Sequence, residues 1–146
     1  MDRTPTLLLF WQRLSAMSKL IFKTSNLEGI GEVTVSSEGE NVIIYSEKGT
    51  WTSQRNTQID FTNVQRWNLN LTDGVISLQH LRRGLSNPVA LVDMVPVDSR
   101  SLSSVDCHVC GSDIYSARLY LVDPGLQLSW RVIGPRKDDE MEYCYS

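Results

Sequence analysis

From Lys19 to the end of the chain, apolar and polar residues alternate in short runs. Turn-forming residues interrupt these runs at intervals of about 8–12 residues, and Asp73-Gly74 is the strongest of these turn signals. Alternation of period two is typical of β-strands with one buried face, because successive side chains point to opposite faces. The pattern therefore predicts about nine or ten short strands and an all-β fold.

Several segments are expected to interrupt these strands. Residues 26–31, with two glycines, are predicted to form a loop, and Glu47-Lys48-Gly49 a turn. Thr62-Asn63 is expected to divide one strand into two, and residues 96–103 to form a polar loop.

One helix is predicted before the strands, over roughly residues 5–17. Thr4 supplies a capping hydroxyl directly before Pro5, which suits the first helical position. Apolar residues then recur at helical spacing, at Leu7, Leu8, Trp11, Leu14 and Met17. We expect this amphipathic helix to plug or flank the sheet through Trp11 and Leu14.

The order of the elements favours a barrel. With 146 residues and no repeat or linker, the chain is expected to form one domain over residues 1–146. Both a two-sheet sandwich and a closed barrel suit so many short strands, but consecutive hairpins without a long crossover favour an antiparallel up-and-down β-barrel with one N-terminal α-helix. A barrel of this strand number can enclose one small ligand.

Composition limits the classes of partner. A net charge of −3 without a basic stripe argues against a nucleic-acid partner. The apolar segment Leu7–Trp11 is too short for a signal peptide or for membrane insertion. Three cysteines, an odd number, suit a reducing compartment, so a cytoplasmic location is expected.

The stretch from His108 to Lys137 holds the main candidate site. Asp113 and Tyr115 begin the inner row of one predicted strand, and Trp130 lies on the inner row of the next. Gly134-Pro135-Arg136-Lys137 follows that second strand, so both ends should meet at one rim of the barrel. If the side chains converge, His108 could act as acid or base, oriented by Asp113, with Tyr115 as proton donor.

Further ligand-contact candidates lie on other strands. Trp67 is expected inside, and His80 and Arg82 continue the apolar row of Ile76 and Leu78. The predicted ligand-binding residues are thus Trp67, His80, Arg82, His108, Asp113, Tyr115, Trp130, Arg136 and Lys137. A metal site is not expected, because Cys107 and Cys110 would fall on opposite faces of a strand and the chain has no second ligand pair. No cofactor is identified.

Three motifs carry a family resemblance. They are Tyr45-x-Glu47-x-Gly49, His108-x-Cys110-Gly111-x-Asp113-x-Tyr115 and Trp130-x-Val132-x-Gly134-Pro135-Arg136-Lys137-Asp138. With them, over roughly residues 9–146, the chain resembles the domain of unknown function 6314 family, found in bacteria including cyanobacteria. The resemblance implies a lipocalin-like barrel that binds small hydrophobic or amphipathic molecules, and it implies no particular activity.

Three functions stay open on these residues. The first is a small-molecule-binding barrel with its site at the barrel mouth. The second is an enzyme of lyase or isomerase type that uses the His/Asp/Tyr cluster. The third is an interaction or assembly factor whose protein partner docks on the helix or a sheet edge, which an exposed Leu7–Trp11 face would favour.

Overall fold

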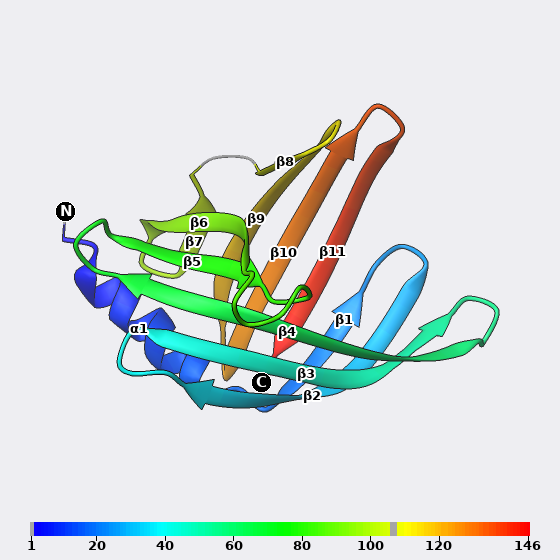
Figure 1. The fold of residues 1–146 in the computed structure, drawn as a ribbon, viewed down its shortest axis with the longest axis horizontal. Helices are drawn as coiled ribbons and strands as arrows, with labels where there is room; N and C mark the ends of the chain where they lie inside the picture. Colours follow the sequence, from blue (N-terminus) through cyan, green and yellow to red (C-terminus); the bar gives the residue numbers. More distant parts are fainter. Residues whose placement is uncertain (1, 106–107) are drawn as a thin grey trace.

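The computed structural model describes residues 2–105 and 108–146, and for residues 108–110 the backbone alone. This part of the chain contains one helix and eleven strands (Figure 1). The elements are α1 (Thr4–Ser15), β1 (Lys19–Lys23), β2 (Leu27–Ser37), β3 (Val42–Ser53), β4 (Gln58–Asn70), β5 (Val75–His80), β6 (Val89–Asp98), β7 (Ser101–Ser104), β8 (His108–Cys110), β9 (Asp113–Val122), β10 (Gly125–Gly134) and β11 (Lys137–Tyr145).

Ten of the strands form a closed antiparallel barrel. Each strand from β1 to β6 pairs with the strand that follows it in the chain. Strand β7 pairs with β9, β9 with β10, and β10 with β11. The ring closes where β11 pairs with β1, for instance Tyr145 opposite Leu20. The short strand β8 pairs with the beginning of β9. The predicted all-β, up-and-down barrel with an N-terminal helix is confirmed.

Helix α1 closes one end of this barrel. It buries Leu7, Phe10, Trp11 and Leu14 against the strands and lies beside the beginning of β3 and the end of β4 (Figure 1). The indole Nε1 of Trp11 donates to the carbonyl oxygen of Glu40, 3.1 Å away. At 12 residues α1 is too short to cross a membrane, and the described part of the chain has no other helix.

The beginning of α1 differs from the sequence-based expectation. Thr4 is itself the first helical residue, and its backbone N–H donates to Oδ1 of Asp2 at 2.9 Å. The N-cap residue is Arg3, which makes no side-chain cap hydrogen bond, and the Asp2 carboxylate before it satisfies this free N–H in place of the Thr4 hydroxyl.

Strands β2 and β3 run without a break through the segments that were predicted to be a loop and a turn. Gly29, Gly31 and Gly49 all lie inside these strands, with Gly31 directly opposite Gly49. A Cβ atom on Gly31 would lie 2.7 Å from the carbonyl oxygen of Lys48, and one on Gly49 would collide with Ile30 and Gly31. The glycines are thus required by the close approach of two strands, a role that sequence alone does not distinguish from a loop.

Two other predicted interruptions are wrong for related reasons. β4 continues through Thr62-Asn63, where Asn63 points inward opposite Glu47 and so resembles a polar break in the sequence. Pro96 lies within β6, at a register shift against β7 where a missing N–H is tolerated. Residues 101–104 then form β7 instead of a loop.

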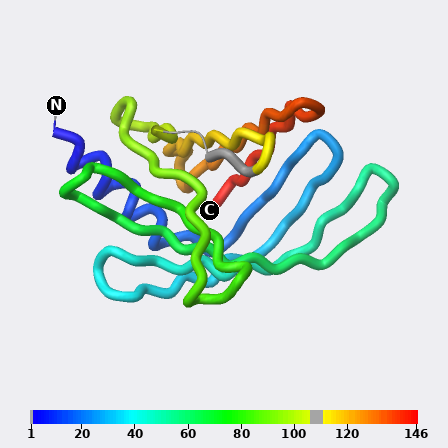
Figure 2. The backbone as a smooth tube through the Cα atoms, turned by 45° about the horizontal axis from the view of Figure 1, so that its top comes forward, coloured from blue at the N-terminus to red at the C-terminus, as the bar shows by residue number. Residues whose placement is uncertain are grey.

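The packed core occupies the half of the barrel next to α1. Tyr45 and Trp67 are fully buried there, with an edge-to-face ring contact at 5.9 Å between centroids. The hydroxyl of Tyr45 donates to the carbonyl oxygen of Leu14 at 2.5 Å and so connects β3 to the last turn of α1. Away from α1, the hairpins β1–β2 and β3–β4 extend beyond this core (Figure 2).

Candidate ligand-binding site

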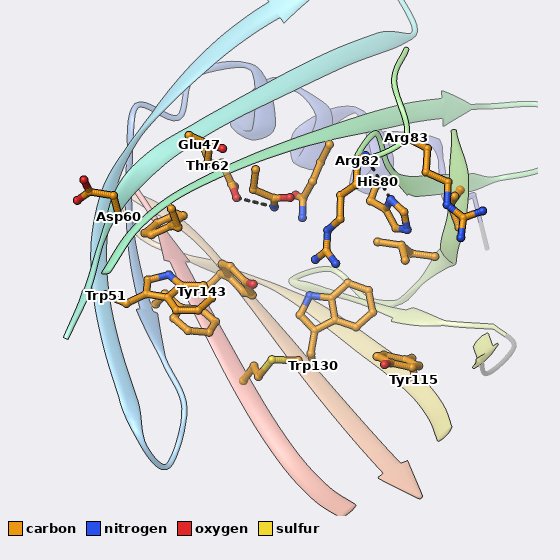
Figure 3. Close-up of a pocket in the computed structure, with 17 residues that line it drawn as sticks. Glu47, Trp51, Asp60, Thr62, His80, Arg82, Arg83, Tyr115, Trp130 and Tyr143 are labelled. Atoms are coloured by element: carbon orange, nitrogen blue, oxygen red, sulfur yellow. Dashed lines mark hydrogen bonds between the residues drawn. The ribbon is translucent and has the colours of Figure 1, made fainter. Parts of the chain in front are cut away.

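The half of the barrel away from α1 contains a cavity of about 750 Å³ (Figure 3). Its walls are largely aromatic, formed by Phe22, Trp51, Phe61, Tyr115, Trp130 and Tyr143. Its polar lining includes Glu47, Asn63, Gln65, His80, Arg82 and Arg83. These groups come from seven strands and the loop over residues 81–88, so the site depends on barrel closure.

One wall is a continuous aromatic surface. The rings of Phe22 and Trp51 stack at 5.6 Å between centroids, and Trp51 also contacts Phe61 at 5.4 Å. Gly29 makes this arrangement possible, since a Cβ atom there would lie 2.8 Å from a ring carbon of Trp51. The wall offers a flat apolar surface to a ligand.

The inner end of the cavity is polar. Glu47 on β3 is only 2% exposed, and its two carboxylate oxygens accept separate hydrogen bonds. Asn63 Nδ2, on the adjacent strand β4, donates to Oε1 at 3.0 Å. The Tyr145 hydroxyl, from β11, donates to Oε2 at 2.6 Å. Glu47, Asn63 and Tyr145 are referred to below as the Glu47 cluster.

Burial dominates the ionisation of this cluster. It raises the pKa of Glu47, while the hydrogen bonds from Tyr145 and Asn63 act in the opposite direction. Burial, followed by the charge of Glu47, raises the pKa of Tyr143 to about 12, and the charge of Arg82 partly opposes this effect. Tyr143 therefore lies within the fields of a buried carboxylate and of a cation.

Gln65 lines the same space and carries a buried, unpaired acceptor. It is 6% exposed, lines the cavity, and lies opposite His80 in the β4–β5 register. Its Oε1 atom is buried without a hydrogen-bond partner. A buried polar atom left unpaired costs about 1–3 kcal/mol, so this oxygen is suited to a donor brought in from outside.

Cations lie at the mouth of the cavity. Arg82 and Arg83 follow the end of β5 and are both exposed. The Arg82 side chain extends toward the indole of Trp130 (Figure 3). Asp60 on β4 lines the cavity on the side of Trp51, away from the two arginines (Figure 3), and its Oδ1 accepts a hydrogen bond from Thr50 Oγ1 at 3.3 Å. The two guanidinium groups thus lie apart from this carboxylate, which has its own partner.

A family model described as "Family of unknown function (DUF6314)" matches residues 13–146. The chain belongs to the DUF6314 family. No curated protein matches this DUF6314 chain significantly. Among solved structures, a redesigned beta barrel, mFAP1, bound to DFHBI is similar at 10% sequence identity and a TM-score of 0.48, over 94% of this chain and 98% of that one.

The structure brings together four of the residues that the sequence indicated. His80, Arg82, Tyr115 and Trp130 all line the cavity of this DUF6314 protein. Trp67 points inward as expected, but it is 0% exposed and belongs to the core beneath the cavity lining.

Three further candidates, Asp113, Arg136 and Lys137, do not line the cavity. The Asp113 carboxylate packs against Gly134, at a point where a Cβ atom on residue 134 would collide with it. The Nζ atom of Lys137 lies 3.4 Å from Oδ2 of Asp113. Arg136 is exposed in the β10–β11 turn. Asp113 thus pairs with Lys137, an interaction that joins β9 to β11. The side chains of His108, Cys107 and Cys110 lie outside the described residues, and the His108–Asp113 pair stays a prediction.

The sequence reasoning missed the Glu47 cluster and Gln65. The signal was the inner row Tyr45, Glu47, Gly49 and Trp51, each two residues apart, which the supposed turn at residues 47–49 concealed. For the third hypothesis, the Leu7–Trp11 segment is divided: Leu7, Phe10 and Trp11 are buried, whereas Leu8 and Leu9 are exposed.

Proposed function

We propose that this DUF6314 protein binds one small amphipathic molecule inside its barrel. The observation that carries the proposal is the cavity of about 750 Å³. Small-molecule sites typically measure about 300–1,000 Å³ and combine apolar walls with a few placed polar groups. The aromatic wall, the Glu47 cluster and the mouth arginines have this composition.

Binding is favoured over the catalytic alternative by the position of Asp113. The enzyme hypothesis needs Asp113 to share a pocket with Tyr115, yet Tyr115 lines the cavity and Asp113 pairs with Lys137 outside that lining. Binding of a ligand in the cavity does not require Asp113 to lie in the same pocket as Tyr115.

Titration with Nile red, a neutral apolar dye, tests the proposal. We expect saturable 1:1 binding with enhanced dye emission, because the dye enters an aromatic environment. Trp130→Leu should weaken binding about tenfold by removing part of the wall. Ile30→Ser serves as the control, since Ile30 is 68% exposed on the outside of the barrel. Circular dichroism should show that both variants are folded.

Two results would refute cavity binding. One is the absence of a 1:1 saturation curve. The other is an affinity that Ile30→Ser reduces and Trp130→Leu leaves unchanged, which would place the dye on the outer surface.

A further inference from the structure

The inner end of the cavity offers acceptors to a ligand. Gln65 lines the cavity, and its Oε1 atom is buried and has no hydrogen-bond partner. The oxygens of Glu47 accept from Asn63 and Tyr145, and each carboxylate oxygen can accept a further hydrogen bond. Trp67 Nε1, another unpaired interior atom, belongs to a side chain outside the cavity lining. A ligand group that reaches this end is therefore best stabilised if it donates a hydrogen bond.

The mouth has the opposite preference. Arg82 and Arg83 form no ion pair with any residue in the described ranges. A guanidinium group presents several donors in a planar arrangement that matches a carboxylate or sulfonate. Arg82 also extends over the cavity toward Trp130, so an anion bound there would remain in contact with the aromatic wall (Figure 3).

The two ends together determine the orientation of a ligand. An anion at the inner end would lie beside the Glu47 carboxylate and would be repelled, whereas at the mouth it can pair with Arg82. Trp51, Phe61 and Trp130 line the same cavity and provide apolar surface for a flat body. Tyr143 also lines this space.

Building on the proposed function, we propose that the ligand is an amphipathic organic acid bound with fixed polarity. Its carboxylate or sulfonate pairs with Arg82 at the mouth, and its opposite end donates a hydroxyl or N–H hydrogen bond to Gln65 beside Glu47. The flat body between these groups packs on the aromatic wall.

A matched set of rigid probes tests this polarity. The set consists of 6-hydroxy-2-naphthoic acid, 2-naphthoic acid without the donor, 2-naphthol without the anion, and 6-amino-2-naphthoic acid with an N–H donor. We expect the hydroxy acid to bind about tenfold tighter than either single-function probe. The affinity of 6-amino-2-naphthoic acid should be about equal to that of the hydroxy acid if either kind of donor suffices, and lower if a hydroxyl group is required.

Two variants assign each end. In Arg82→Gln, the advantage of the hydroxy acid over 2-naphthol should fall to less than about twofold, because the cation has been removed. In Gln65→Met, the advantage over 2-naphthoic acid should fall in the same way. Arg136→Gln makes the same charge change outside the cavity lining and should leave every ratio unaltered.

Nile red separates the two ways to fail. Equal affinities for the hydroxy acid, 2-naphthoic acid and 2-naphthol in the wild type, with Nile red still bound, would overturn the polarity and leave the cavity proposal standing. The polarity is also refuted if Arg136→Gln alters the ratios as much as Arg82→Gln. Loss of Nile red binding in the wild type would refute the proposed function itself.

Discussion

The hydroxyl group of Tyr145 donates a hydrogen bond of 2.6 Å to Oε2 of Glu47 across the interior of the barrel. The two residues lie on β11 and β3, strands that are not neighbours in the sheet. A second bond from Asn63 completes the environment of the carboxylate. Two donors thus offset part of the cost of removing Glu47 from water.

Replacing Tyr145 by phenylalanine should destabilise the protein by about 1.5–3 kcal/mol, because a buried carboxylate loses a donor. The free energy of unfolding can be measured with urea at neutral pH. Tyr143→Phe is the control, because Tyr143 lies two residues away on the same strand face. The hydrogen bonds to Glu47 come from Tyr145 and Asn63, so this variant leaves them in place. Equal losses in the two variants would show that the Tyr145 hydroxyl has no special role.

Glu47 should make the protein less stable as the solution becomes more alkaline. Its pKa in the folded state is raised above the ordinary value of 4.5, so the folded state holds this proton more tightly than the unfolded state. The resulting stabilisation is present below that ordinary value and is lost as the pH rises through the folded-state pKa.

The Glu47→Gln variant isolates this effect, because glutamine does not titrate. The free energy of unfolding of the variant, relative to the wild type, should increase as the pH rises above the ordinary value of 4.5. Urea unfolding across this range measures the difference. A difference that stays constant, or that decreases with pH, would contradict the assignment.

Tyr45→Phe should loosen the closed end of the barrel. The Tyr45 hydroxyl donates to the Leu14 carbonyl oxygen, and its loss should cost about 1 kcal/mol and accelerate amide hydrogen exchange within α1. Tyr120→Phe is a suitable control, because Tyr120 lies on the outer face of β9. Unchanged exchange in α1 of the Tyr45 variant would show that the helix is held by packing alone.

Gly49→Ala should be a strongly damaging glycine substitution within the strands. The added methyl group would collide with the backbone of Ile30 and Gly31, at a cost of about 3 kcal/mol. Gly74→Ala provides a comparison, since Gly74 has a φ of +71° but open space around its Cα atom. That variant should lose only about 1–2 kcal/mol. Thermal unfolding would rank the two, and the reverse order would refute a steric role for Gly49.

The barrel could be predicted from sequence because its determinants are local. Alternation on β10 placed Trp130 inside, and the same pattern placed His80 and Arg82 on an inner row. Breaks in the pattern at Gly31, Gly49 and Asn63 were misinterpreted, since a glycine or an asparagine facing the interior resembles a turn.

The candidate site could be predicted only in part, because its partnerships join distant residues. Tyr145 and Glu47 are 98 positions apart, and no local pattern pairs them. Asp113 was expected beside His108, whereas its described partner, Lys137, depends on how the β9 and β11 ends meet. Strand phase can show that a side chain faces inward, but the packed fold determines which group it meets there.

The position of α1 has a kinetic consequence. Since the helix and the core block one end of the barrel, a ligand that leaves the cavity passes the same rim that it crossed on arrival. A substitution confined to that rim, such as one at Leu85 in the loop over residues 81–88, would alter the association and dissociation rates by one common factor. Residence time could then change while the equilibrium constant stays the same, so the speed of exchange and the strength of binding can vary independently in this barrel.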